Sequence, residues 1–131
     1  PMQWDDSENA GFTNGTPWIK VNPNYTEINA KAAITEPDSV FHYYQELIHL
    51  RHTLPIIVYG KFQGLLEDSE TIYAYNRLLD GQVLTVACNF TSHEQDCTLC
   101  DDISAKELIS NYKTHIAGKL QPYEARVILH Q

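Results

Sequence analysis

Hydrophobic and polar positions follow three successive patterns along the chain. Residues 1–34 show no period, because aromatic side chains are scattered among Asn, Gly, Pro, Thr and Asp, which favour turns. Residues 37–54 carry apolar side chains at helical spacing, and Pro55 should end that helix. From residue 56 onward apolar positions alternate with a period of two, which is typical of half-buried strands. The pattern predicts a long loop, one helix and an all-antiparallel β unit.

The β unit is expected to contain about six to eight short strands. Their predicted positions are 56–59, 61–66, 71–79, 83–90, 95–99, 106–110, 119–121 and 125–129. Asp80-Gly81 fits a type I′ hairpin turn, whose two central residues both need positive φ. Before the long helix, a short helical turn is predicted at 29–34, with Asn29 as its N-cap.

Composition narrows the class of protein. The chain has 131 residues, 43% of them hydrophobic, so it can bury a core. Nine basic residues against 17 acidic ones give a net charge of −8, which argues against a nucleic-acid or anionic-lipid partner. No apolar run approaches the roughly 18 residues of a membrane helix. The chain starts at Pro1 without the features of a signal peptide, so we expect a cytoplasmic chain cut from a longer protein.

The three cysteines predict free thiols in a reducing compartment, because an odd count makes a poor disulfide framework. Cys97 and Cys100 form a CxxC motif, but one such pair supplies only two of the ligands that a structural zinc ion needs. The motif falls in a predicted strand and not at a helix start, where a redox motif would lie. We therefore expect neither a metal site nor a cofactor.

Catalytic constellations are scarce. His49 and His52 are three residues apart in the predicted helix, but no acidic third ligand is clearly aligned with them, so a solvated helix face is favoured over a metal site. A glycosidase needs two carboxylates about 5–9 Å apart that face each other across a sugar. Adjacent acids in a strand point to opposite faces, and those in turns usually face water. Of the three adjacent acidic pairs, Glu67/Asp68 and Asp101/Asp102 are interpreted as turn acids, whereas the role of Asp5/Asp6, in the aromatic loop, stays open.

The aromatic loop is the most informative section. Trp4, Phe12, Trp18 and Tyr25 lie among Asn, Gln and Asp, a composition found on carbohydrate-handling surfaces. Flat rings there cover sugar faces, and amides bind hydroxyl groups. Taken alone, however, the residues favour the simpler interpretation that these rings pin an irregular loop.

Several longer motifs carry a resemblance to a known family. They are Pro1-Met2-Gln3-Trp4-Asp5-Asp6, Asn9-Ala10-Gly11-Phe12-Thr13, Val21-Asn22-Pro23-Asn24-Tyr25, Asp38-Ser39-Val40-Phe41 and Pro122-Tyr123-Glu124-Ala125. In this order they resemble the bacterial α-glucosidases of the α-amylase superfamily. The most similar branch holds oligo-1,6-glucosidase, dextran glucosidase and trehalose-6-phosphate hydrolase, and the resemblance covers nearly the whole chain.

The resemblance implies a mainly β fold, an antiparallel β-sandwich of the α-amylase domain C type, preceded by a long loop and the last helix of a (β/α)8 barrel. Residues 1–54 would end the barrel and residues 55–131 would form the C-terminal domain. The loop would lie at the C-terminal face of the barrel, where barrel enzymes place their active sites. Gln3 and Trp4 would then lie at the rim of the substrate pocket.

The resemblance also implies that the parent protein hydrolyses α-glucoside oligosaccharides with retention, using an Asp nucleophile and a Glu acid/base on earlier barrel strands. None of the 17 acidic residues here matches a catalytic position, so the chain itself is expected to have no catalytic residue. Its partner would be the catalytic barrel of the same parent chain. Left uncovered, its apolar helix face favours self-association. The residues expected to pack on neighbours are Val40, Phe41, Tyr44, Leu47 and Ile48.

A glycan-binding β-sandwich module is the alternative function. It would stack sugars on a platform of rings, although the same tyrosines are better explained as filling the sandwich core or its interface with the barrel. The candidate platform consists of Tyr59, Phe62, Tyr73, Tyr75 and Tyr123.

Overall fold

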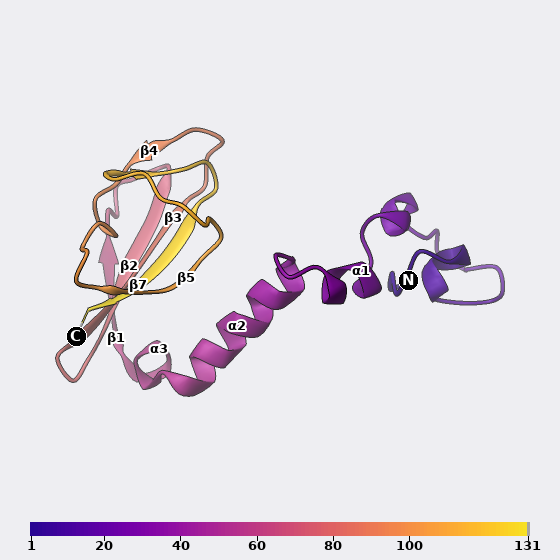
Figure 1. Cartoon of the computed structure of the whole chain (residues 1–131), viewed down its shortest axis with the longest axis horizontal. Helices are drawn as coiled ribbons and strands as arrows, with labels where there is room; N and C mark the ends of the chain where they lie inside the picture. Colours follow the sequence, from indigo (N-terminus) through magenta and orange to yellow (C-terminus); the bar gives the residue numbers. More distant parts are fainter. Residues whose placement is uncertain (131) are drawn as a thin grey trace. The chain divides into compact units, whose positions relative to one another are not determined.

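The computed structural model describes residues 1–130 and contains two compact units. The first unit is Pro1–Glu46, the second begins at Leu47, and the boundary falls inside helix α2 (Figure 1). Within the described residues, helices are too short or too polar to cross a membrane.

The first unit consists of loops joined by short helical turns. These are the 3-10 helices η1 (Glu8–Gly11) and η2 (Pro23–Thr26) and the helix α1 (Ala30–Thr35). The prediction for Asn29 is confirmed, because its Oδ1 accepts a hydrogen bond from the Ala32 amide at 2.8 Å. Its Nδ2 also donates to the Tyr25 carbonyl at 2.8 Å, so this one side chain joins α1 to the turn before it.

Helix α2 (Val40–Thr53) is the long predicted helix, but it begins three residues later than expected. Residues 37–39 form a turn, and Oγ of Ser39 accepts from the His42 amide at 3.4 Å, as an N-cap would. Apolar side chains that the sequence analysis assigned to a packed face are exposed in this chain. Their exposed fractions are Val40 80%, Phe41 43%, Tyr44 63%, Leu47 36% and Ile48 50%.

The strand predicted at 56–59 is wrong. These residues lie in a one-turn helix, α3 (Pro55–Tyr59), with Pro55 in its first turn. Proline suits that position because its missing N–H would have no partner there and its φ is already helical. Ile56 is 2% exposed and packs on the sheet, which anchors this turn.

The sheet confirms the predicted antiparallel β unit. Its five strands are β1 (Lys61–Leu65), β2 (Ile72–Leu79), β3 (Gln82–Asn89), β5 (Lys106–Ser110) and β7 (Ala125–His130), in the order β1-β2-β3-β7-β5 (Figure 1). β4 (Gln95–Asp96) and β6 (Lys119–Leu120) form a separate pair. The β2–β3 turn has φ of 49° at Asp80 and 83° at Gly81, as a type I′ turn requires.

The sheet has two faces of different character. The inner face is defined by Ile72, Ala74, Ala87 and Ile128. Buried side chains from the connection between β3 and β7 pack against these residues. These side chains include Cys97, Cys100 and Leu120. Because residues 97–100 turn to bury the two thiols, the predicted strand 95–99 is reduced to β4. The outer face carries Tyr73, Tyr75, Arg77, Leu84, Val86 and Val127, and α3 covers only part of it.

Candidate functional site

Gln3 and Trp4, the predicted rim residues, lie in the first unit beside residues 24–31. Nε2 of Gln3 donates to Oδ1 of Asn24 at 2.9 Å and to the Ile28 carbonyl at 2.6 Å. The carbonyl groups of Gln3 and Trp4 accept from the Ala30 and Lys31 amides, both at 2.9 Å. The Gln3 amide nitrogen therefore holds the loop together, whereas the Trp4 side chain is 54% exposed and open to a ligand.

Three consecutive residues next to this pair have left-handed backbone conformations. The φ angles are 55° at Asn9, 58° at Ala10 and 65° at Gly11. For a non-glycine residue this conformation costs on the order of 1 kcal/mol or more, and such residues cluster at functional sites. Ala10 is fully buried, and its carbonyl accepts from the amides of Trp4 at 2.9 Å and Asp5 at 3.3 Å. The strained turn thus fixes the backbone of Trp4.

Asp5 closes the same turn. Its Oδ1 accepts from the Ser7 amide at 2.9 Å and from the Ser7 hydroxyl at 2.5 Å. The Ser7 hydroxyl, followed by the Ser7 amide, lowers the pKa of the Asp5 carboxyl below its ordinary value of 3.8. A Cβ on Gly11 would lie 2.8 Å from the same oxygen, so glycine is required at that position. The Asp5 carboxylate therefore has a structural role in this turn.

The histidines of α2 and the CxxC cysteines were the candidate ligands considered in the sequence. Within residues 1–130 no group of three His, Cys, Asp or Glu side chains is placed to hold a metal ion. His49 and His52, the pair of histidines predicted on the helix, are both exposed on α2. Cys97 and Cys100 are buried, and burial raises the pKa of the Cys100 thiol to about 12. These thiols are therefore structural in character.

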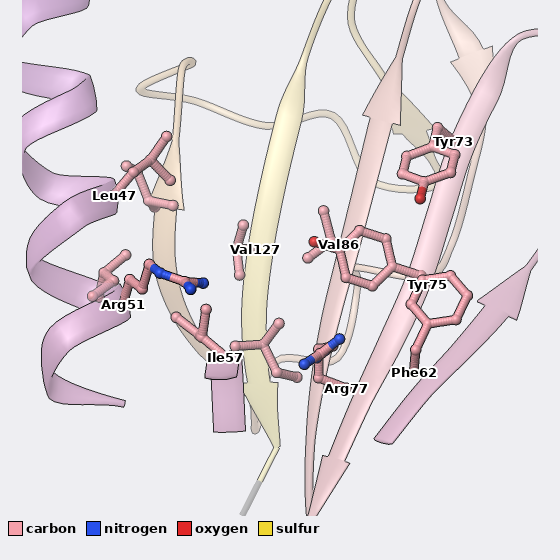
Figure 2. Close-up of a pocket in the computed structure, with 12 residues that line it drawn as sticks. Leu47, Arg51, Ile57, Phe62, Tyr73, Tyr75, Arg77, Val86 and Val127 are labelled. Carbon is pink, nitrogen blue, oxygen red and sulfur yellow. The ribbon is translucent and has the colours of Figure 1, made fainter. Parts of the chain in front are cut away.

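The second unit contains a pocket of about 440 Å³ on the outer face of the sheet (Figure 2). Leu47, Leu50 and Arg51 of α2 form one wall, and side chains of the sheet form the opposite wall. Figure 2 shows Arg51 reaching from the helix towards the strands and Arg77 rising from the sheet. The pocket is thus an apolar hollow that contains two guanidinium groups.

Three aromatic rings border this pocket in a row. The Phe62 and Tyr75 centroids are 5.3 Å apart, and those of Tyr75 and Tyr73 are 5.6 Å apart. Phe62 and Tyr73 are 52% and 53% exposed. The structure therefore brings together three of the five predicted platform residues. Among the described residues, Tyr59 and Tyr123 have no ring contact with this row, although both are exposed.

A partly buried ionic cluster lies on the inner face. Glu124 is completely buried and Arg126 is 8% exposed. Arg126 pairs with Glu107 at 3.1 Å, and His115 contacts both Glu107 and Glu124. Oε2 of Glu124 also accepts from the Gln121 amide at 2.6 Å. The cluster connects β5, β7 and the preceding connection, and its closed set of partners marks it as structural.

Comparisons with known proteins identify the family. A profile described as the catalytic domain of alpha amylase matches residues 1–60. The chain is 54% identical to an oligo-1,6-glucosidase from Parageobacillus thermoglucosidasius, over 97% of this chain and 24% of that protein. It is 40% identical to a trehalose-6-phosphate hydrolase from Bacillus subtilis, again over 97% and 24%. The chain belongs to the α-amylase superfamily. It spans about a quarter of the length of the relatives that it matches.

Solved α-amylase superfamily structures support the fold. A trehalose-6-phosphate hydrolase from Bacillus licheniformis superposes with a TM-score of 0.90 at 43% identity, covering 98% of this chain and 25% of that one. The mainly β fold expected from the resemblance is therefore confirmed. In these relatives the matching region is part of a larger single chain.

Arg51 and Arg77 were not singled out by sequence reasoning. The sequence did contain a signal for Arg77. Tyr73, Tyr75 and Arg77 occupy alternate positions in β2 and therefore share one face of the sheet. Arg51, in contrast, comes from the helix, and only the tertiary structure brings it to the same pocket. No local signal marks the buried carboxylate of Glu124, because its side-chain partner His115 lies nine positions away in the sequence.

Proposed function

We propose that this chain is the non-catalytic C-terminal part of a retaining α-glucosidase that hydrolyses α-1,6- or related α-glucosidic bonds in short oligosaccharides. The observation that carries the proposal is the 54% identity to an oligo-1,6-glucosidase over nearly the whole chain, which spans only 24% of that enzyme. The nucleophile and the acid/base would lie in the remaining three quarters.

The proposed role is to complete and brace the catalytic barrel. Residues 1–54 would supply the loop and helix that end the barrel, and residues 55–131 would form the C-terminal domain. Exposed apolar side chains on α2 support this assignment, because surfaces of this kind mark packing sites. Bracing matters for catalysis, since misplacing a catalytic group by about 1 Å can lower the rate about 100-fold.

Gln3 and Trp4 are proposed to lie at the rim of the substrate pocket. The rigid turn at Asn9–Gly11 and the exposed Trp4 ring support this placement, because a fixed aromatic ring is suited to stacking on a sugar. The Gln3 side chain would act by positioning the loop. The proposal assigns the parent enzyme to the cytoplasm, in keeping with three free thiols.

A chimeric enzyme tests the proposal. This chain replaces the matching quarter of the Parageobacillus thermoglucosidasius oligo-1,6-glucosidase, and hydrolysis of p-nitrophenyl α-glucoside, isomaltose and trehalose 6-phosphate is measured for the chimera and for the chain alone. The proposal expects an active chimera and a silent chain. Turnover by the chain alone, or a folded but inactive chimera, would refute it.

A glycan-binding module is the second candidate, favoured by the row formed by Phe62, Tyr75 and Tyr73. Stacking on such a row contributes to sugar binding through the ring faces. Affinity electrophoresis in gels containing dextran tests it, with Tyr73→Ala as the variant and Tyr44→Ala, on the exposed helix, as the control. Retardation that only Tyr73→Ala abolishes would support this module. Identical mobility with and without dextran would exclude it.

Self-association of the isolated chain is also proposed, because α2 leaves its apolar face uncovered. Sedimentation velocity over a range of concentrations measures it. A mass that remains monomeric at all concentrations would exclude it.

A further inference from the structure

The pocket on the outer face contains two positive charges without a negative partner. Arg51 and Arg77 both line it. Among the residues that the structure describes, neither guanidinium group is part of an ion pair. Arg126, the third arginine of the chain, is paired with Glu107 at 3.1 Å. The two pocket arginines therefore differ from the remaining arginine in lacking a carboxylate.

Arg77 has a specific hydrogen-bonding deficit. One terminal nitrogen of its guanidinium donates to the Val58 carbonyl at 3.2 Å. Nε is shielded from solvent and has no hydrogen-bond partner within the described part of the chain. Native proteins leave few such groups unsatisfied. This buried N–H is therefore an unsatisfied donor on a residue that lines the pocket.

The remaining walls define what an occupant of this pocket looks like. Leu47, Ile57, Val86 and Val127 supply aliphatic surface, and the rings of Phe62 and Tyr75 border it. An apolar element would satisfy these walls, and a carboxylate would satisfy the guanidinium groups. Arginine binds carboxylates through paired N–H groups, and it is favoured where an ion pair is partly desolvated at an interface.

We propose that this pocket receives an Asp or Glu side chain carried by an apolar surface of the catalytic barrel. The inference rests on the proposed function, because it takes the occupant from the three quarters of the relatives that this chain does not span. The carboxylate contacts Arg77 and Arg51 and fixes the register in which the β domain packs on the barrel. The aromatic row then borders this contact and does not bind a glycan.

The first experiment uses 4-phenylbutyrate as a mimic of an apolar carboxylate, with the uncharged 4-phenylbutanol as its control. In the ¹⁵N-labelled chain, the Nε–Hε signals of the three arginines are followed during titration. Arg77 and Arg51 are expected to shift saturably with the carboxylate only, while Arg126 stays in place. Arg77→Gln should weaken binding at least about tenfold, because a charge-assisted hydrogen bond is lost. No shift, or equal shifts with the alcohol, would overturn the carboxylate site.

The second experiment tests whether the occupant belongs to the protein. The melting temperatures of this chain and of the chimera described above are measured with and without 4-phenylbutyrate. The compound should raise the melting temperature of the chain but not of the chimera, in which the barrel already fills the pocket. An equal rise in both would assign the pocket to a free small molecule and overturn the docking inference. An inactive chimera that is insensitive to the compound would refute the proposed function while leaving the pocket's occupancy supported.

Discussion

Nδ1 of His115 lies 2.6 Å from Oε1 of Glu124, a carboxylate that is completely buried. The other ring nitrogen of His115 lies 3.1 Å from Oε1 of Glu107. Within the described residues, the other partners of this carboxylate are the Gln121 amide at 2.6 Å and Nε of Arg126 at 4.0 Å. His115 is therefore the main side-chain partner of this buried carboxylate, and it ties the connection before β7 to the sheet.

Replacing this ring should destabilise the second unit. His115→Ala is expected to lower the free energy of unfolding by about 3 kcal/mol, because removing one partner leaves a buried carboxylate poorly compensated. Urea denaturation measures the change. His93→Ala serves as the matched control, since His93 is exposed and its loss should cost less than about 0.5 kcal/mol. Equal losses for the two variants would contradict this role.

Asn89 connects the end of β3 to two later segments, residues 91–93 and the region of Gln121. Its Nδ2 donates to the carbonyls of His93 at 2.7 Å and Gln121 at 2.8 Å, and its Oδ1 accepts from the Thr91 amide at 2.9 Å. Asn89→Asp should cost at least about 3 kcal/mol, because it places a carboxylate against carbonyl oxygens in a buried position. Asn14→Asp is the control. Like Asn89, Asn14 lies two residues before a threonine, but its side chain is exposed. Similar urea midpoints for the two variants would disprove the prediction.

The Cys100 thiol should be unreactive in the folded protein. Burial raises its pKa from 9.0 to about 12, so the thiolate fraction at pH 8 falls about a thousandfold. Iodoacetamide labelling followed by mass spectrometry should therefore modify Cys100 quickly in urea and very slowly in buffer. Cys88, which is only partly buried, provides the internal comparison. Fast labelling of Cys100 in buffer would mean that the inner face opens readily.

The turn around Asp5 should weaken in acid. Hydrogen bonds from Ser7 hold the folded pKa of Asp5 below 3.8, so the carboxylate stabilises the folded state above the unfolded pKa. That contribution is lost as the pH falls through the folded pKa. A ¹³C titration of the Asp5 carboxyl should give a pKa below 3.8 in the native chain and a higher one in Ser7→Ala. An unchanged pKa in the variant would rule out Ser7 as the cause.

The proposed packing of α2 on a barrel predicts a context-dependent effect of Phe41. In the chimera, Phe41→Ala should destabilise by roughly 3–5 kcal/mol, as expected for a buried ring. In the isolated chain the same change should cost much less, because Phe41 is 43% exposed there. Thermal denaturation of both proteins measures the difference. Equal effects in the two contexts would remove the support for this packing.

Sequence reasoning succeeded where local chemistry decides the structure. The Asp80-Gly81 turn and the Asn29 cap were correct because each depends on a few adjacent residues. It failed at 56–59, where a short apolar run fits a strand or a buried helical turn equally well. Pro55 was taken as the end of one helix, whereas it also begins the next.

The candidate site was less accessible to prediction than the fold. Arg51 and Arg77 are 26 positions apart and line the same pocket only because the end of α2, from Leu47 onward, borders the outer face of the sheet. No periodic pattern in a sequence connects a helix residue to a strand residue. The buried carboxylate of Glu124 likewise depends on His115 and on the Gln121 amide, and no periodic pattern links these positions. Tertiary contacts decide both features.

The strand order β1-β2-β3-β7-β5 also has a consequence for synthesis on the ribosome. β7 lies between β3 and β5, yet it is the last strand of the sheet to be translated. Until β7 emerges, β5 has no strand to pair with. The inner face that Cys97, Cys100 and Leu120 pack against is also incomplete until then. Nascent chains that stall before residue 125 would therefore display an unpaired β3 edge, the form most exposed to chaperones and to aggregation.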